Sequence, residues 1–178
     1  MTDRLTKDDW LKRGLKTLAT DGAHALKVGP MAAKLKVSRG SFYWHFKDVA
    51  DFQSQILRRW QERSTDQVIR ELDIDKAQPD RLKQLMKRAF AGKRDLERAI
   101  RSWAAEDAAV ARSVAGVDAR RMAYIAKMLA AAGVDRKKTL SRAAFLYWAY
   151  LGQPLVTMPR HAAVTASMLD DLGRLFVS

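Results

Sequence analysis

The chain has 178 residues, 48% of them hydrophobic, which suffices for one well-buried core with a small appended module. It contains no cysteine, so disulfide bridges and thiolate metal sites are excluded, and a reducing cytoplasm is the expected compartment. Lysine and arginine exceed aspartate and glutamate by 33 to 20, and this net charge of +13 predicts attraction to polyanions.

The beginning of the chain carries a large share of this charge. Residues 1–47 hold ten basic and four acidic side chains, whereas they make up about a quarter of the sequence. These residues lack the apolar run of a secretion signal, and no stretch of the chain approaches the ~20 apolar residues that span a bilayer. We therefore expect a soluble, cytoplasmic protein that carries a basic N-terminal region.

Hydrophobic residues recur at helical spacing throughout, without an alternating strand pattern, so an all-α fold is expected. A first helix is predicted over about residues 7–21, closed by Gly22 in the left-handed conformation. A short helix over about 29–36 places Pro30 in its first turn. Ser38 can cap a third helix over about 39–45, and Asp48 with Asp51 can start a longer one that reaches about residue 73.

The rest of the chain is also predicted to be helical. Pro79 follows a polar break, and Gly133 and Pro159 separate later segments. The expected helices cover about residues 79–92, 94–106, 108–132, 137–152 and 160–177.

Three short N-terminal helices, the second and third joined by a tight turn, describe a helix-turn-helix DNA-binding module. In the segment Met31–Phe46, Phe42 and Phe46 are four residues apart and should pack inward. Arg39, Ser41, Tyr43 and Trp44 are then left at or near the outward side. Arg39 suits bidentate pairing with guanine, and Tyr43 offers a hydroxyl to a phosphate. The run Val-Ser-Arg-Gly-Ser-Phe-Tyr-Trp-His-Phe over residues 37–46, followed by Lys47-Asp48, resembles the DNA-binding domain of the tetracycline-repressor (TetR) family.

The resemblance covers about 50 residues and implies a homodimeric, effector-controlled transcription regulator. It implies DNA-binding roles position by position. Phosphate contacts are expected from Ser38, Tyr43, His45 and Lys47, base-edge contacts from Arg39, Gly40, Ser41 and Trp44, and a compensating phosphate contact from Lys27.

Three positions depart from the family pattern. Lys36 stands where a turn glycine is common, which predicts a positive φ at about 1 kcal/mol cost. Gly29 cannot offer the side-chain base contact that relatives often make there, and Val49 replaces a common phosphate-binding lysine. These departures change which DNA contacts are expected, but the DNA-binding domain itself is still expected.

We expect a DNA-binding domain over residues 1–50 and a helical ligand-binding and dimerisation domain over 51–178. Aromatic residues in the middle of the chain are mostly core, but some suit an effector pocket for a flat or apolar molecule. The last two helices are rich in apolar residues, which favours an isologous dimer interface. The candidate pocket residues are Trp103, Tyr124, Met128, Tyr147 and Trp148.

Several alternatives remain open. His45 could hydrogen-bond within its own domain, and Tyr43 and Trp44 could be packing residues. A nonspecific DNA-binding protein or a helical scaffold fits the basic composition, and an activator fits as well as a repressor. Catalysis is disfavoured because the chain has three histidines, no cysteine and no Gly-rich phosphate loop. No metal site and no cofactor are expected.

Overall fold

In the computed structural model the described residues are 5–74, 81–156 and 164–177, and they form helices and turns without a β-strand. The all-α prediction is therefore confirmed for this part of the chain. These residues form two compact units. The first contains the residues up to Asp66 together with Arg94–Ala115, and the second contains Gln67–Lys93 and the residues from Gly116 onward.

The first helix, α1 (Lys7–Asp21), has the bounds that the sequence predicted. It begins at Thr6, whose side chain accepts a hydrogen bond from the Asp9 amide, while Asp9 accepts one from the Thr6 amide. This reciprocal capping box satisfies two amides that would otherwise lack a partner. The helix ends at Gly22, whose φ of 81° is positive as expected. Its ψ of 176° lies outside the left-handed helical region, so that part of the prediction was wrong.

Two short helices follow the 3₁₀ turn η1 (Ala23–Ala25). They are α2 (Val28–Leu35) and α3 (Arg39–Tyr43), joined by three residues. Lys36 ends α2 with φ 57° and ψ 41°, the only positive φ outside glycine among the described residues. The prediction of a left-handed backbone at Lys36 is therefore confirmed.

Helix α4 (Val49–Gln61) continues through a turn of π-helix, η2 (Glu62–Asp66), into α5 (Gln67–Ile74). Asp48 caps α4 by accepting a hydrogen bond of 2.7 Å from the amide of Asp51, as the sequence predicted. The sequence did not predict the π turn, which carries the buried Thr65 and falls at the boundary between the two units.

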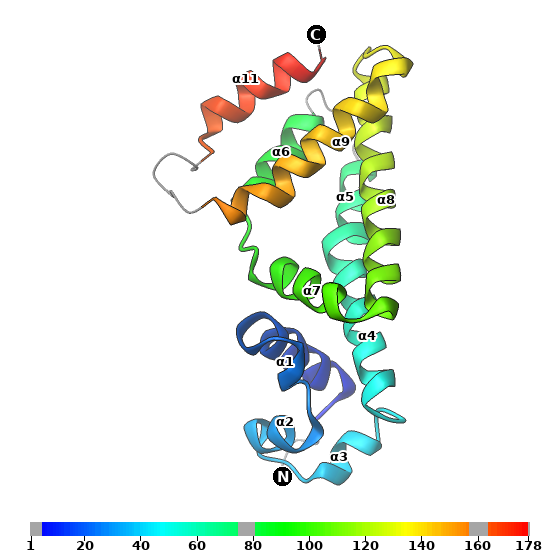
Figure 1. Ribbon diagram of the computed structural model, residues 1–178, viewed down its shortest axis with the longest axis vertical. Helices are drawn as coiled ribbons and strands as arrows, with labels where there is room; N and C mark the ends of the chain where they lie inside the picture. Colours follow the sequence, from blue (N-terminus) through cyan, green and yellow to red (C-terminus); the bar gives the residue numbers. More distant parts are fainter. Residues whose placement is uncertain (1–4, 75–80, 157–163, 178) are drawn as a thin grey trace. The chain divides into compact units, whose positions relative to one another are not determined.

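An aromatic core holds the first unit together. Phe42 is 1% exposed, and its ring lies 5.1–5.4 Å from those of Trp10, Phe46 and Phe52. Helix α1 approaches α4 closely at Gly14, where a Cβ would lie 2.6 Å from Cδ1 of Ile56. Helix α7 (Asp95–Glu106) packs against α1 on another side. Figure 1 shows α2 and α3 side by side below α1.

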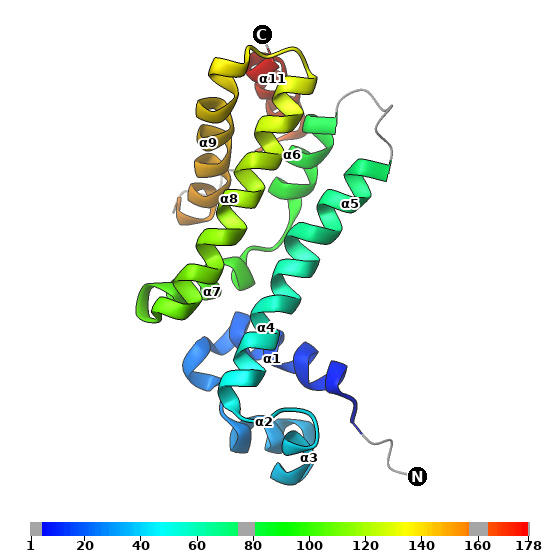
Figure 2. The ribbon, with the colours of Figure 1, turned by 90° about the vertical axis from the view of Figure 1, so that its right-hand side faces the viewer.

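The second unit contains α5, α6 (Arg81–Ala91), most of α8 (Ala108–Ala131), α9 (Arg136–Gly152), the 3₁₀ turn η3 (Gln153–Leu155) and α11 (Ala166–Val177). A tight turn with Gly133 at φ 93° connects α8 to α9 (Figure 2). Helix α6 packs against α11, where Lys83 pairs with Asp170 at 2.9 Å. The core includes Leu72, Met86, Leu129, Ala143, Leu146 and Leu169.

The later helices agree with the predicted ranges to within about two residues, except that α11 begins at Ala166, so Val164 and Thr165, which were predicted to be helical, are not. The predicted breaks at Pro79 and Pro159, and the predicted first residues of two helices at 79–80 and 160–163, lie outside the described residues. Within the described part, no helix combines the length and the apolar character that crossing a bilayer would require.

Candidate nucleic-acid interface

The α2–α3 segment separates an inward apolar side from an outward polar and aromatic side. Met31, Ala32, Phe42 and Phe46 are each at most 2% exposed. The left-handed backbone at Lys36 reverses the chain so that the two short helices pack against each other. The buried residues therefore fix the direction in which the other side chains of α3 point.

The outward side of α3 exposes two large aromatic residues. Tyr43 is 60% exposed and Trp44 is 75% exposed, although the Tyr43 ring edge rests on Phe42 with centroids 5.3 Å apart. Ser38 and Gly40 are exposed and Ser41 is half-buried. Ser38 occupies the N-cap position, but its side chain makes no capping hydrogen bond. An exposed tryptophan and tyrosine beside hydroxyl groups form a surface suited to contact with a polar partner.

Arg39 is exposed at the first position of α3, and its guanidinium lies against the backbone of Gly29 in α2. A Cβ at residue 29 would lie 3.3 Å from Nη2, 3.5 Å from Cζ and 3.5 Å from Nε of Arg39. This contact could not be predicted from the sequence. Helical periodicity relates residues within one helix, whereas Gly29 and Arg39 lie ten residues apart in two different helices.

Exposed lysines precede and follow α3 in the chain. Lys27 is exposed at the N-cap of α2, and Lys47 is exposed just before α4. The Lys47 amide donates to the carboxylate of Asp51. Hydrogen bonds from the Gln55 side chain and then from this amide lower the pKa of Asp51 below its ordinary value of 3.8. Asp51 therefore stays negative at neutral pH and stabilises the positive end of the α4 dipole.

His45 is oriented toward the interior of the first unit. Its Nε2 lies 2.9 Å from the carbonyl oxygen of Leu5, and the ring is half-buried. This geometry agrees with the alternative in which His45 hydrogen-bonds within its own domain. A phosphate contact by His45 stays a prediction.

The structure places the five candidate pocket residues in different surroundings. Trp103 is buried in the first unit, whereas the other four belong to the second. Met128 is buried in the core of the second unit, and Trp148 is 64% exposed on α9. An effector pocket at these residues stays a prediction.

The hydroxyl groups of the two candidate tyrosines already have partners. Tyr124 donates to Asp73 over 3.0 Å and accepts from Arg81 over 3.0 Å. Burial, and then the hydrogen bond to Asp73, raise the pKa of Tyr124 above 10.0. Tyr147 donates to Asp118 over 2.6 Å. These polar groups stabilise the helix packing of the second unit.

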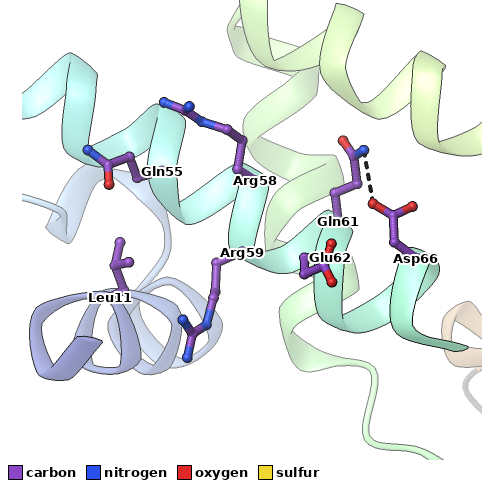
Figure 3. A pocket seen from close by; sticks show the side chains of 7 residues that line it. All are labelled: Leu11, Gln55, Arg58, Arg59, Gln61, Glu62 and Asp66. Carbon is purple, nitrogen blue, oxygen red and sulfur yellow. Dashed lines mark hydrogen bonds between the residues drawn. The ribbon is translucent and has the colours of Figure 1, made fainter. Parts of the chain in front are cut away.

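A hollow of about 430 Å³ lies in the first unit, next to α4 and η2 (Figure 3). Leu11, Arg58, Arg59, Glu62 and Asp66 contribute to its wall. Two arginines and two carboxylates line it together, and none of the five candidate pocket residues does. The mixture of charges gives the hollow no clear ligand preference.

Among the described residues, no three histidine or acidic side chains gather into a group that could hold a metal ion. Compared with protein-family models the chain matches none, and no curated protein matches it.

Proposed function

We propose that the protein is a site-specific DNA-binding transcription regulator of the TetR type, most simply a repressor, that acts by binding rather than by catalysis. The observation that carries the proposal is the exposed side of α3. Buried Phe42 and Phe46 anchor it, while Arg39, Tyr43 and Trp44 stand in solvent. This surface combines a guanidinium for base edges with a phenol for phosphates.

The flanking charges support the same proposal. Lys27 and Lys47, before and after α3 in the chain, are exposed, and basic residues outnumber acidic ones ten to four in residues 1–47. Lys34 is less suited to DNA, because its ammonium pairs with Asp21 at 2.6 Å. In the proposed complex α3 enters the major groove, with Arg39, Gly40, Ser41 and Trp44 near base edges. Ser38, Tyr43 and the two lysines reach phosphates beside it.

We further propose that two copies pair through α9 and α11. Large apolar side chains are exposed on both helices, among them Phe145, Trp148 and Leu175. The two helices are neighbours, since the rings of Phe145 and Phe176 lie 5.9 Å apart. A second copy with the same surface would cover these residues symmetrically. It would also supply a second α3 for a palindromic site with half-sites about 34 Å apart.

We also propose that a small-molecule effector releases the protein from DNA. The support for this step is the resemblance of residues 37–46 to the TetR family. Such an effector would bind best to a dimer whose two α3 helices have a spacing that does not match the two half-sites, and it would thereby relieve repression. The alternative is nonspecific DNA binding by a basic helical protein. The high net charge supports that alternative, whereas an ordered aromatic surface on α3 favours site recognition.

Selection of random DNA on the purified chain at about 0.15 M salt, followed by sequencing, tests the proposal. We expect a shared palindrome whose binding survives excess bulk DNA. Arg39→Ala should weaken binding by about 1–3 kcal/mol and relax the preference at one base pair in each half-site. Diffuse recovery without a motif would instead favour charge-driven, nonspecific binding, and an unchanged preference in Arg39→Ala would remove Arg39 as a base reader.

A further inference from the structure

We infer that Gly29 is a positioning residue for DNA specificity, because the absence of a side chain there makes room for the guanidinium of Arg39. The inference rests on the proposed function and extends it to a residue that has no side chain to touch DNA. Gly29 would thus influence which base pair is preferred by controlling where Arg39 lies.

The geometry of the contact supports this role. The three distances from an added Cβ to Nη2, Cζ and Nε of Arg39 span only 3.3–3.5 Å. A point almost equally distant from three guanidinium atoms faces the flat side of the group rather than its tip. The guanidinium therefore lies across the start of α2, where Gly29 is the second helical residue. Its edge carries the N–H groups, and this edge remains available to pair with a base.

The backbone conformation at position 29 does not require a glycine. Its φ is not positive, and it lies inside the regular helix α2. Gly29 lies in the first turn of α2, and fixing the backbone of a glycine costs more conformational entropy than fixing that of an alanine. A role in making space for Arg39 accounts for that cost. Among the glycines at ordinary φ, Gly116 in α8 offers a contrast, since a Cβ there would meet no atom within 4 Å.

The size of a substituent at position 29 should set the size of the effect. An alanine Cβ at 3.3 Å requires the guanidinium to move by a few tenths of an ångström. A longer side chain, as in Gly29→Gln, would occupy the space of the guanidinium and turn Arg39 away. Glutamine is a good helix former, so this change should leave α2 intact.

The test compares base preference in wild type, Gly29→Ala, Gly29→Gln, Arg39→Ala and the double variant Gly29→Gln/Arg39→Ala. We expect Gly29→Gln to reduce discrimination at the base pair that depends on Arg39 by roughly 5- to 150-fold, with a smaller reduction in Gly29→Ala. In the Arg39→Ala background the same Gly29→Gln change should have no further effect at that base pair. Such non-additivity is expected only if the glycine acts through the arginine.

Matched controls separate positioning from folding. Gly116→Ala and Gly116→Gln introduce the same side chains into an open position of a helix and should leave DNA preference unchanged. The Tm of Gly29→Ala should equal or exceed that of wild type, as a helix-favouring change requires. A lost preference together with an unchanged or higher Tm would support positioning, because a structural defect would lower both.

The outcomes also distinguish this inference from the proposed function. If wild type selects a motif and Gly29→Gln retains the same preference, the inference is overturned and the proposed function stands. If Gly29→Gln shifts the preference equally with and without Arg39, Gly29 does not act through Arg39, and the inference is again overturned. If wild type selects no motif at all, both are overturned.

Discussion

At the scale of single residues, Lys36 has a strained backbone, because a lysine occupies a turn position where glycine is common. Its φ of 57° and ψ of 41° place it in the left-handed helical region, where a side chain crowds the following carbonyl. The turn nevertheless forms, because Met31 and Ala32 before it and Phe42 after it are buried in the same core. Packing of these side chains thus outweighs about 1 kcal/mol of local strain.

Lys36→Gly should therefore stabilise the free protein. Glycine adopts this backbone without strain, so we expect the free energy of unfolding to rise by about 0.5–1 kcal/mol. Denaturant unfolding at 25 °C measures the change. Ala33→Gly, in the regular part of α2, is the matched control and should lower the free energy by about 1 kcal/mol. Equal destabilisation by both changes would show that residue 36 is not strained in solution.

At the scale of helices, a small polar network joins three elements of the second unit. Asp73 at the end of α5 pairs with Arg81 at the start of α6 and accepts a hydrogen bond from Tyr124 of α8. Burial opposes ionisation of Asp73, but the hydrogen bonds from Tyr124 and Arg81 together with nearby Lys127 lower its pKa below 3.8. The charged carboxylate is therefore the form that holds the three helices together.

Asp73→Asn should remove a pH-dependent part of the stability. A carboxyl group whose pKa is lowered by folding stabilises the protein above its unfolded-state value, and this contribution is lost as the pH falls through the folded value. We expect the Tm of Asp73→Asn to be lower than that of wild type at pH 6, with the difference shrinking as the pH falls below about 4. Asp171→Asn, on an exposed side chain of α11, is the control. A Tm difference that is the same at pH 6 and pH 3 would contradict this role of Asp73.

The sequence predicted the helices better than their interactions. Caps and periodicity are local signals, and they predicted the Asp48 cap and the bounds of α1. The positive φ of Lys36 was predicted instead from the resemblance, because a turn glycine is common at that position. The π turn η2 has no such signal, because its spacing depends on which side chains the neighbouring helices bury. The contact between Gly29 and Arg39 likewise depends on how two helices are packed.

The outward side of α3 was predictable in part for the same reason. The four-residue spacing of Phe42 and Phe46 indicates which side is buried, so exposure of Tyr43 and Trp44 follows from periodicity. Periodicity does not show that His45 reaches the carbonyl of Leu5, forty residues earlier in the chain. Long-range contacts of this kind require the packed structure.

At the scale of the whole molecule, the sequence of α9 conflicts with its surroundings in a single chain. Ten of the twelve residues in 140–151 are apolar, which predicts a helix covered on several sides. In the single chain Leu140, Phe145 and Trp148 are 59–68% exposed, and Leu175 of the neighbouring α11 is 65% exposed. Covering such residues lowers the free energy by about 25 cal/mol per Å², so a second copy is a strong candidate to occupy this surface.

Replacing two of these residues by arginine tests the dimer without disturbing the core. Trp148→Arg combined with Leu175→Arg places charges on exposed positions, so helix content should be unchanged while association is lost. Light scattering should then give a mass of 20.1 kDa instead of twice that value. Affinity for a palindromic site should fall at least about 100-fold, because each half-site would have to bind independently.

Ile74→Arg, 82% exposed on α5, is the control and should remain dimeric. A wild-type protein that is monomeric at micromolar concentration would contradict the dimer. A double variant that still dimerises would show that the interface does not depend on α9 and α11, so these helices would not set the half-site spacing.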